Sequence, residues 1–287
     1  MGAKKIVYGE EAREKFRYSI EHLKILKKGV EVWNKWRDEN PDVWPQLIGA
    51  DLHDQDLSGY DLHNAFMQHA NLSGAILKDA WLSCTHFEQA NLTSADLSGA
   101  FAEWALFYGS LMDKCTAMEA NFTKATFENA SAVDANFASA IFHYSILRNT
   151  NLKNAYLSHT DFTAAKMSNA NLKGARLGLT SFVNSDLSNA CSLELCEHGS
   201  YSYLDHLTLQ QSSYIPIAFL RGCGLPELFI DYLPSILNSA IEYYFCFISY
   251  SYADKAFAIR LYAQLQQKGI RCYLDRHQML PGDGLHE

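Results

Sequence analysis

The strongest constraint on the fold of this chain is a sequence period of five residues. From Leu52 to Leu187 every fifth residue is a candidate core position, which gives 28 positions without an insertion. Twenty-five of these positions hold Leu, Phe or Met, and a small residue precedes each position by two places, except at Gln55 and Tyr60. The three other positions hold alanine: Ala102, Ala117 and Ala132. We expect the core to be thinnest there, since alanine buries little apolar surface.

Neither of the common elements can use a period of five. Residues five apart differ by about 140° around an α-helix, so the large side chains would spiral over every face. In a flat strand, an odd spacing sends successive large side chains to opposite sides. A chain that turns through a quarter circle at each step points all of them at one axis, and four steps make a coil of about twenty residues. The period therefore predicts a mainly β fold, a parallel β-helix of about seven coils stacked at strand spacing.

Three segments of this region resemble a known repeat. The stretches "ANLTSADLSGA", "ANFTKATFENA" and "ANLKGARLGLT" are similar to the A(D/N)LXX unit of pentapeptide-repeat proteins. The resemblance implies a right-handed quadrilateral β-helix over residues 46–190.

The first part of the chain is expected to cover one end of this β-helix, because an open coil exposes an apolar layer. Residues 1–45 predict a capping helix that ends near Pro41 and Pro45. A separate helical binding site for a partner is the alternative. The apolar residues near helical spacing are Phe16, Ile20, Leu23, Val30 and Trp33.

Past residue 190 the five-residue phase ends. We expect residues 191–242 to form a helical cap for the last coil and a linker. The short apolar runs of this segment are separated by three prolines, Pro216, Pro226 and Pro234.

The outward-facing residues predict an interaction surface on one side of the β-helix. The residue before each core position points outward, and every fourth such residue shares a side. Seven apolar residues are thereby expected to form one exposed patch, and patches of this kind usually mark contact surfaces. Cover by the C-terminal segment, or an inward shift of Phe101 beside Ala102, is the alternative. The patch comprises Trp81, Phe101, Trp104, Leu106, Ile141, Tyr144 and Ile146.

The last residues, 243–287, read as strand, helix and strand, which predicts one βαβ unit with parallel strands. "FISYSYAD" and "LDRHQMLPGDGL" resemble two signatures of the Toll/interleukin receptor (TIR) domain, and "FLRGCGLPELFIDYL" resembles the linker that joins bacterial pentapeptide repeats to such a domain. The resemblance implies an incomplete flavodoxin-like α/β segment, since a parallel sheet needs several strands buried on both faces.

TIR domains either assemble with one another or hydrolyse NAD, and the resemblance assigns residues to the second role. It implies that Tyr250, Ser251 and Tyr252 lie beside the dinucleotide, in the loop after the first strand. The remaining implied NAD-binding residues are Tyr273, near the nicotinamide, and Pro281 and Gly282, in the loop that gates the pocket. The catalytic glutamate of the family belongs to a later helix that these residues do not reach, so we expect no catalysis by this chain and NAD as a cofactor only in a longer parent.

Composition excludes several classes of function. The net charge is −8, and residues 50–190 carry −6 of it, so no segment has the basic field that direct nucleic-acid binding requires. We find no long apolar run and no export signal, so we expect a cytoplasmic protein without a membrane partner and with reduced thiols. His53 and His63 lie two steps apart, on opposite sides of a coil, and we therefore expect no metal site.

These observations lead to three functional hypotheses. The first is a non-catalytic scaffold that binds a protein partner or itself through the apolar patch and carries a TIR element for signalling, in bacterial defence. The second is an NAD-hydrolysing TIR enzyme in a longer parent chain. The third is a DNA mimic that binds gyrase, for which a charge of −6 is modest.

Overall fold

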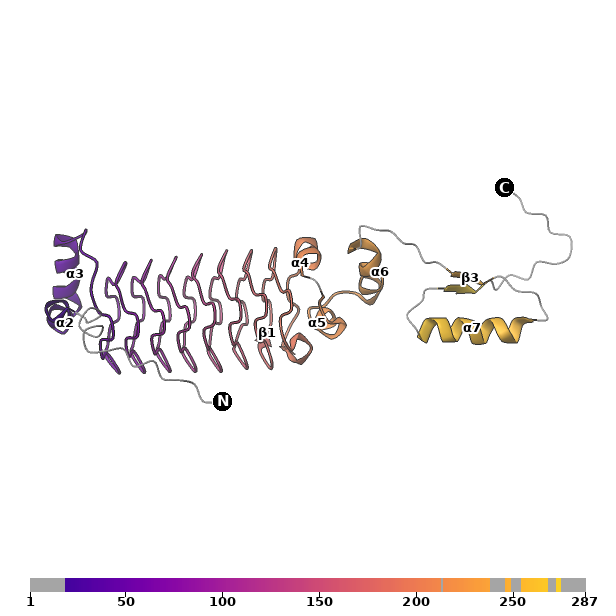
Figure 1. Ribbon diagram of the computed structural model, residues 1–287, viewed down its shortest axis with the longest axis horizontal. Helices are drawn as coiled ribbons and strands as arrows, with labels where there is room; N and C mark the ends of the chain where they lie inside the picture. Colours follow the sequence, from indigo (N-terminus) through magenta and orange to yellow (C-terminus); the bar gives the residue numbers. More distant parts are fainter. Residues whose placement is uncertain (1–18, 213, 238–245, 249–253, 268–271, 275–287) are drawn as a thin grey trace, which may run out of the picture. The chain divides into compact units, whose positions relative to one another are not determined.

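The computed structural model describes residues 19–212, 214–237, 246–248, 254–267 and 272–274. They belong to two compact units, Met1–Asp231 and Tyr232–Glu287. The coils of five-residue steps make up most of the first unit (Figure 1).

Parallel pairing between residues twenty apart builds the coils. Asp51 pairs with Asn71, Asn71 pairs with Asn91, and over residues 46–191 such pairs line up into four ladders. Two-residue strands, β1 (Arg176–Leu177) and β2 (Glu197–His198), form one further parallel pair. This pairing confirms a parallel β-helix and the predicted grouping of outward residues into sides. The number of coils and the right-handed twist stay predictions.

Three backbone hydrogen bonds per step hold neighbouring coils together, one of them from the amide of the turn residue, as from Asp54 to the carbonyl of Ser73 at 2.9 Å. The amide of Leu52 donates to the carbonyl of Asn71 at 2.8 Å, and the amide of Asn71 donates to the carbonyl of Ala50 at 2.9 Å. The chain then turns at the second residue after each core position, for example at Asp54, where φ is positive (54°). Gly, Asn and Asp tolerate this conformation best, which explains their frequency there.

All 28 predicted core positions, from Leu52 to Leu187, are buried. Phenylalanines from successive coils stack along the axis, with ring centroids 5.0 Å apart for Phe87 and Phe107. Where alanine replaces a large residue, rings on different sides meet edge to face, as Phe107 and Phe122 do at 5.7 Å. The core beside the alanines is thus occupied by phenylalanine rings that reach across the axis.

Outward Asn and Asp side chains stabilise the turns. The Asp96 carboxylate accepts hydrogen bonds from both the amide and the hydroxyl of Ser98, at 3.0 and 2.6 Å. Asn91 accepts from the Thr93 amide at 3.1 Å in the same way. The D/N of the repeat is therefore a turn-capping residue, a role that the sequence pattern alone did not reveal.

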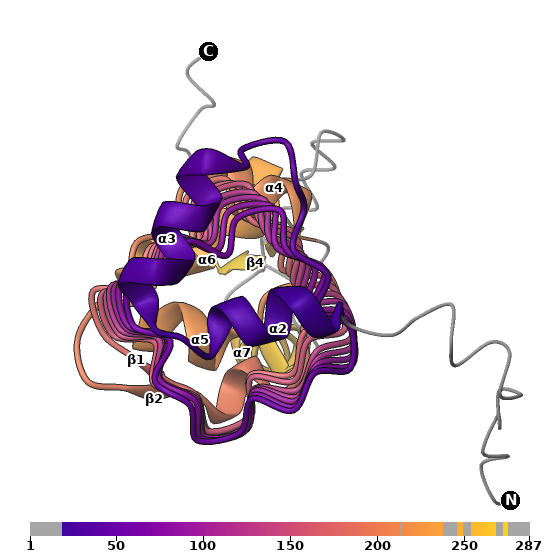
Figure 2. The ribbon, with the colours of Figure 1, turned by 90° about the vertical axis from the view of Figure 1, so that its left-hand side faces the viewer.

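Two helices, rather than the single expected helix, cover the first coil: α2 (Ile20–Leu26) and α3 (Val30–Glu39). The chain breaks between them at Gly29, whose φ of 105° an L-residue rarely adopts. Figure 2 shows both helices lying across the open end of the coils. Trp33 is fully buried as predicted, whereas Ile20 is exposed because it lies on the outer side of α2.

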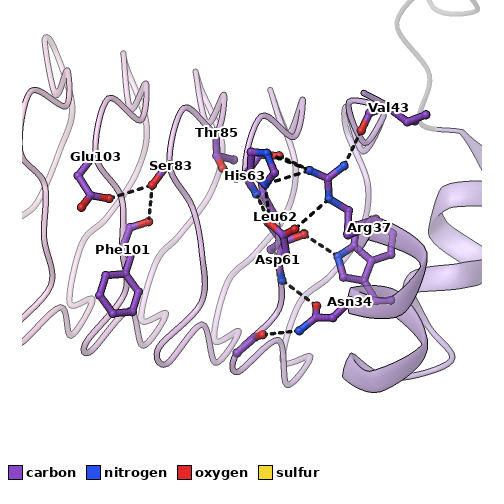
Figure 3. Close-up of polar contacts among 12 residues, drawn as sticks. Asn34, Arg37, Val43, Asp61, Leu62, His63, Ser83, Thr85, Phe101 and Glu103 are labelled. Atoms are coloured by element: carbon purple, nitrogen blue, oxygen red, sulfur yellow. Dashed lines mark hydrogen bonds and ion pairs between the residues drawn. The ribbon is translucent and has the colours of Figure 1, made fainter. Parts of the chain in front are cut away.

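Side chains of α3 take the place of a preceding coil (Figure 3). The Trp33 indole donates to the Asp61 carbonyl at 2.7 Å, and the Asp61 amide donates to the Asn34 side chain at 2.9 Å. Buried Arg37 donates to the His63 carbonyl at 3.1 Å and approaches the Asp61 carboxylate at 3.4 Å. These contacts satisfy edge groups that would otherwise be unpaired.

The other end of the β-helix is closed by the same means. Parallel pairing continues beyond the predicted boundary at residue 190, to Tyr203, and is followed by α4 (His206–Gln211) and α5 (Ile217–Gly222). The Asn184 amide donates to Asp205, and the Leu187 amide donates to Ser212, at 2.9 and 3.0 Å. A short helix, η1 (Leu193–Leu195), lies within the last coil.

Helix α6 (Glu227–Leu237) follows, with Pro234 inside it rather than at its end. In the second unit, β3 (Cys246–Ile248) and β4 (Cys272–Leu274) are parallel, and α7 (Lys255–Gln267) lies between them in sequence. This order confirms the predicted strand–helix–strand unit. Among the described residues, no helix has the length and apolar character to span a bilayer.

The central phenylalanine cluster should dominate the stability of the β-helix. Phe122→Ala is expected to lower the free energy of unfolding by about 3–5 kcal/mol, because four other rings contact Phe122. Phe101→Ala is the matched control, since that ring is 47% exposed and its loss should cost about 1 kcal/mol or less. Denaturant unfolding followed by circular dichroism measures both, and equal losses would contradict the assigned core.

The N-terminal cap should weaken on acidification. Burial lowers the pKa of His22 from 6.5, an effect that Glu21 opposes and Arg37 reinforces. Neutral His22 accepts a hydrogen bond from the Gln46 amide at 2.9 Å. At pH values between the lowered pKa and 6.5, the unfolded chain therefore binds more protons than the folded chain. The contribution of His22 to the free energy of unfolding is complete above this window and declines as pH falls through it.

Thermal unfolding at several pH values tests this dependence against His22→Asn, whose side-chain oxygen can accept the same hydrogen bond without titrating. The variant should lose less stability than the unchanged chain between neutral and mildly acidic pH. An identical loss in both would show that His22 is not the responsible group.

Candidate interaction face of the β-helix

The candidate face is built on one ladder and the turn column beside it. The ladder runs through Asp61, Trp81, Phe101, Asn121 and Ile141. Trp81 and Phe101 are adjacent on it and are 58% and 47% exposed. Because both are held by inter-coil hydrogen bonds, their rings project from a fixed backbone about 4.8 Å apart along the axis.

The turn column contributes two more aromatic side chains in an unfavourable conformation. Trp104 and Tyr144 have φ of 60° and 57°, at the turn position where Gly, Asn and Asp are the stable choices. A left-handed conformation costs an ordinary residue about 1–2 kcal/mol. Both side chains are also exposed, at 55% and 61%, so burial does not offset this cost. Other residue types, including Lys114, Glu119 and Leu179, adopt the same conformation at other turns, so Trp104 and Tyr144 are distinguished by their large exposed aromatic side chains and not by the conformation itself.

The predicted patch is divided rather than continuous. Asn121 lies between Phe101 and Ile141 on the ladder, and Thr126 lies between Leu106 and Ile146 on the next one. The structure thus brings Trp81, Phe101, Trp104 and Leu106 into one apolar group. It places Ile141, Tyr144 and Ile146 in a second group beyond a polar coil, and Leu106, Ile141 and Ile146 are only partly exposed.

The polar coil between the groups is organised by charged residues. Glu103 accepts a hydrogen bond from Ser83 at 2.8 Å (Figure 3). It accepts a second one from the Asn121 amide group at 2.7 Å. The Lys124 ammonium lies 4.4 Å from the centroid of the Trp104 ring, a cation–π contact. A glutamate and a lysine therefore lie beside the polar coil that separates the apolar groups.

A hydrogen-bonded histidine and aspartate close the face beyond the second group. His143 and Asp161 are 2.9 Å apart. Burial raises the pKa of Asp161, but hydrogen bonds from Thr163 and from His143 outweigh it, so the net pKa lies below the ordinary value. Asp161 is therefore charged at neutral pH and limits the apolar surface in this direction.

Other exposed apolar residues lie outside the predicted patch. Leu111 and Tyr156 are exposed on the two other ladders, and Met118 is 40% exposed at the turn before Asn121. Sequence reasoning missed Met118 because it considered mainly the residue before each core position. What distinguishes the predicted face is the adjacency of its aromatic side chains, not the presence of exposed apolar residues as such.

Most of the residues implied in NAD binding, Tyr250, Ser251, Tyr252, Pro281 and Gly282, lie outside the described residues. Tyr273 is in β4, where its backbone is in register with Phe247 of β3. The geometry of an NAD site stays a prediction.

The described residues offer no metal cluster, and three of their cysteine thiols are shielded from solvent. Within them, no group of three or more His, Cys, Asp or Glu side chains could hold a metal ion. Burial raises the pKa of Cys196 to about 12, and neighbouring Glu194 adds to this shift. Burial likewise raises the pKa of Cys223 to about 12, and the nearby Cys196 adds to that shift. Burial also raises the pKa of Cys115. Thiols with such high pKa values are inert structural groups.

A parallel β-helix built from five-residue steps around a Leu and Phe core defines the class of pentapeptide-repeat proteins. The family model described as pentapeptide repeats matches in eight copies, and the model described as TIR domain matches residues 246–287. The chain therefore carries pentapeptide repeats followed by a TIR-domain segment. The repeat matches span 46–79, 70–109, 120–158, 147–178 and 160–191.

Solved structures with similarity to this chain are also pentapeptide-repeat proteins or resistance proteins. HetL, involved in heterocyst differentiation regulation in the cyanobacterium Nostoc sp. strain PCC 7120, is 28% identical, with 54% of this chain and 73% of that chain covered and a TM-score of 0.32. QnrB1, a plasmid-mediated fluoroquinolone resistance protein, is 16% identical, with 65% and 92% covered and a TM-score of 0.49. A thylakoid-lumen protein of Arabidopsis thaliana is 23% identical, with 45% and 89% covered and a TM-score of 0.30. No curated protein matches the chain.

Proposed function

We propose that this chain is a non-catalytic scaffold of the cytoplasm that binds protein through the candidate face and links that contact to a TIR element. We call this face, with the exposed residues Trp81, Phe101, Trp104 and Tyr144, the aromatic face. The observation that carries the proposal is the exposure of four aromatic side chains on one side of the β-helix: Trp104 lies beside Trp81 and Phe101, and Tyr144 lies beyond the polar coil of Asn121. Aromatic residues are the side chains most enriched where protein interfaces concentrate their binding energy. A rigid ladder also reduces the conformational entropy lost on binding.

The role of the TIR-domain segment rests on its family match and on the parallel pairing of β3 and β4. TIR and pentapeptide-repeat domains both commonly mediate contacts between proteins. In this proposal the β-helix binds a protein, and the TIR element passes this contact on as a signal. Hydrolysis of NAD is the alternative, and incubation of the 287-residue chain with NAD tests it, because turnover would overturn the non-catalytic assignment.

The third hypothesis, a DNA mimic that binds gyrase, has less support from the ladders. A mimic of a duplex needs acidic side chains at regular intervals, since DNA carries about one charge per 1.7 Å of axis. The ladder that begins at Asp51 continues through Asn71, Asn91, Leu111 and Ser131 without another acid. The aromatic face runs over several coils where acids would be needed.

Removal of two indoles tests the proposal. The double variant Trp81→Ser, Trp104→Ser should lose at least about tenfold in affinity for itself or for a partner, since truncating an interface aromatic residue commonly costs more than 1–2 kcal/mol. Light-scattering mass and quantitative pull-down from the source cells measure the two cases. Trp44→Ser is the matched control, because Trp44 is 48% exposed near the N-terminal cap, outside the face. Unchanged mass together with unchanged pull-down would remove the aromatic face as the binding surface.

A further inference from the structure

From the arrangement of the aromatic face we infer that its occupant is a second copy of this chain, packed antiparallel about a two-fold axis. The inference rests on the proposed function, because it assumes that the face binds protein. It goes further by fixing the partner, the direction of packing and the residues that meet.

The order of the coils on the face suits antiparallel self-packing. Its two apolar groups lie on either side of the polar coil of Asn121 and Lys124. A two-fold axis perpendicular to the β-helix, between the coil of Phe101 and the coil of Asn121, reverses the order of coils in the second copy. Phe101 and Trp104 of each copy then lie opposite the polar coil of the other, and Tyr144 lies opposite the small residue Cys84.

The charges beside the polar coil favour the same arrangement. Reversing the coils brings Glu103 of one copy to the Lys124 coil of the other, and this happens twice because the contact is isologous. A parallel arrangement would instead bring like residues together, with the two Glu103 side chains at one level and the two Lys124 side chains at another. Opposite charges across an interface select register and orientation.

The ends of the contact are compatible with this register. Asp61 and Asp161 lie five coils apart on the same ladder. In the antiparallel dimer, Asp61 of one copy would lie opposite Asp161 of the other. Each already has a partner in its own chain, since Arg37 approaches Asp61 and His143 lies 2.9 Å from Asp161. Like charges at the ends are thus partly compensated before the copies meet.

The expected affinity is moderate. Trp81, Phe101, Trp104 and Tyr144 are each about half exposed, and a fully buried aromatic side chain covers roughly 150–250 Å², so together they supply about 400 Å² per copy. A stable interface uses about 800 Å² per partner. The dimer should therefore be concentration-dependent, and sedimentation over a wide range of concentrations is the appropriate first measurement.

Charge exchange between two variants tests the register directly in the full chain. Glu103→Lys places lysine against Lys124, and Lys124→Glu places glutamate against Glu103, so each variant alone should weaken self-association at least about tenfold. An equimolar mixture restores both opposite-charge contacts in a heterodimer. Fluorescently labelled Glu103→Lys chain should therefore bind unlabelled Lys124→Glu chain tightly and bind unlabelled Glu103→Lys chain weakly in an anisotropy titration.

Lys153→Glu is the matched control, because Lys153 is exposed at a turn between two other sides of the coil and should leave self-association unchanged. Circular dichroism and thermal unfolding of each variant establish that the β-helix is intact.

The outcomes separate this inference from the proposed function. Three results would overturn the antiparallel dimer. The chain could be a monomer at every concentration, neither charge variant could weaken the dimer, or the mixture of the two variants could fail to recover binding. If the chain is monomeric but its capture of another protein depends on Trp81 and Trp104, the proposed function stands and only the self-packing is wrong. If neither self-association nor capture depends on these indoles, both are wrong.

Discussion

Inter-coil hydrogen bonding with a period of twenty residues is the constraint on which the rest of the first unit depends. Once Leu52 pairs with Asn71 and Asn71 with Ala50, every outward residue is assigned to a side and every large apolar residue to the axis. The positive-φ turn after each core residue makes the chain change direction, and the D/N side chain, as at Asp96, caps that turn. Core, turns and surface columns are therefore consequences of one repeated step.

The same constraint creates the need for caps. A coil satisfies its backbone groups only through the coils above and below it, so the first and last coils have groups without a partner. The ends solve this problem with side chains from short helices, Trp33, Asn34 and Arg37 at one end and Asp205 and Ser212 at the other. In both caps, side chains therefore form the hydrogen bonds that the backbone of an additional coil would otherwise form.

A scaffold of this kind separates stability from recognition. Burial of Leu and Phe along the axis supplies the stability, so the outward positions are free to vary with the partner. Asp61 is used to dock a cap, whereas Trp81 and Phe101 on the same ladder are left exposed. Trp104 and Tyr144 at two of the turns add exposed aromatic surface to the same side of the coil, as expected of a binding face.

The sequence by itself determined the axis-facing residues, the sides of the coil and the parallel strand–helix–strand order of the last segment, because periodicity and residue type fix these features locally. It did not reveal the break at Gly29, the docking of Arg37 between Asp61 and His63, the extension of pairing to Tyr203, or the division of the apolar patch at Asn121. Those features depend on which groups are left unpaired at a coil end and on which residues become neighbours twenty positions apart. Only the tertiary structure decides them, since contacts between distant parts of the chain carry no local pattern.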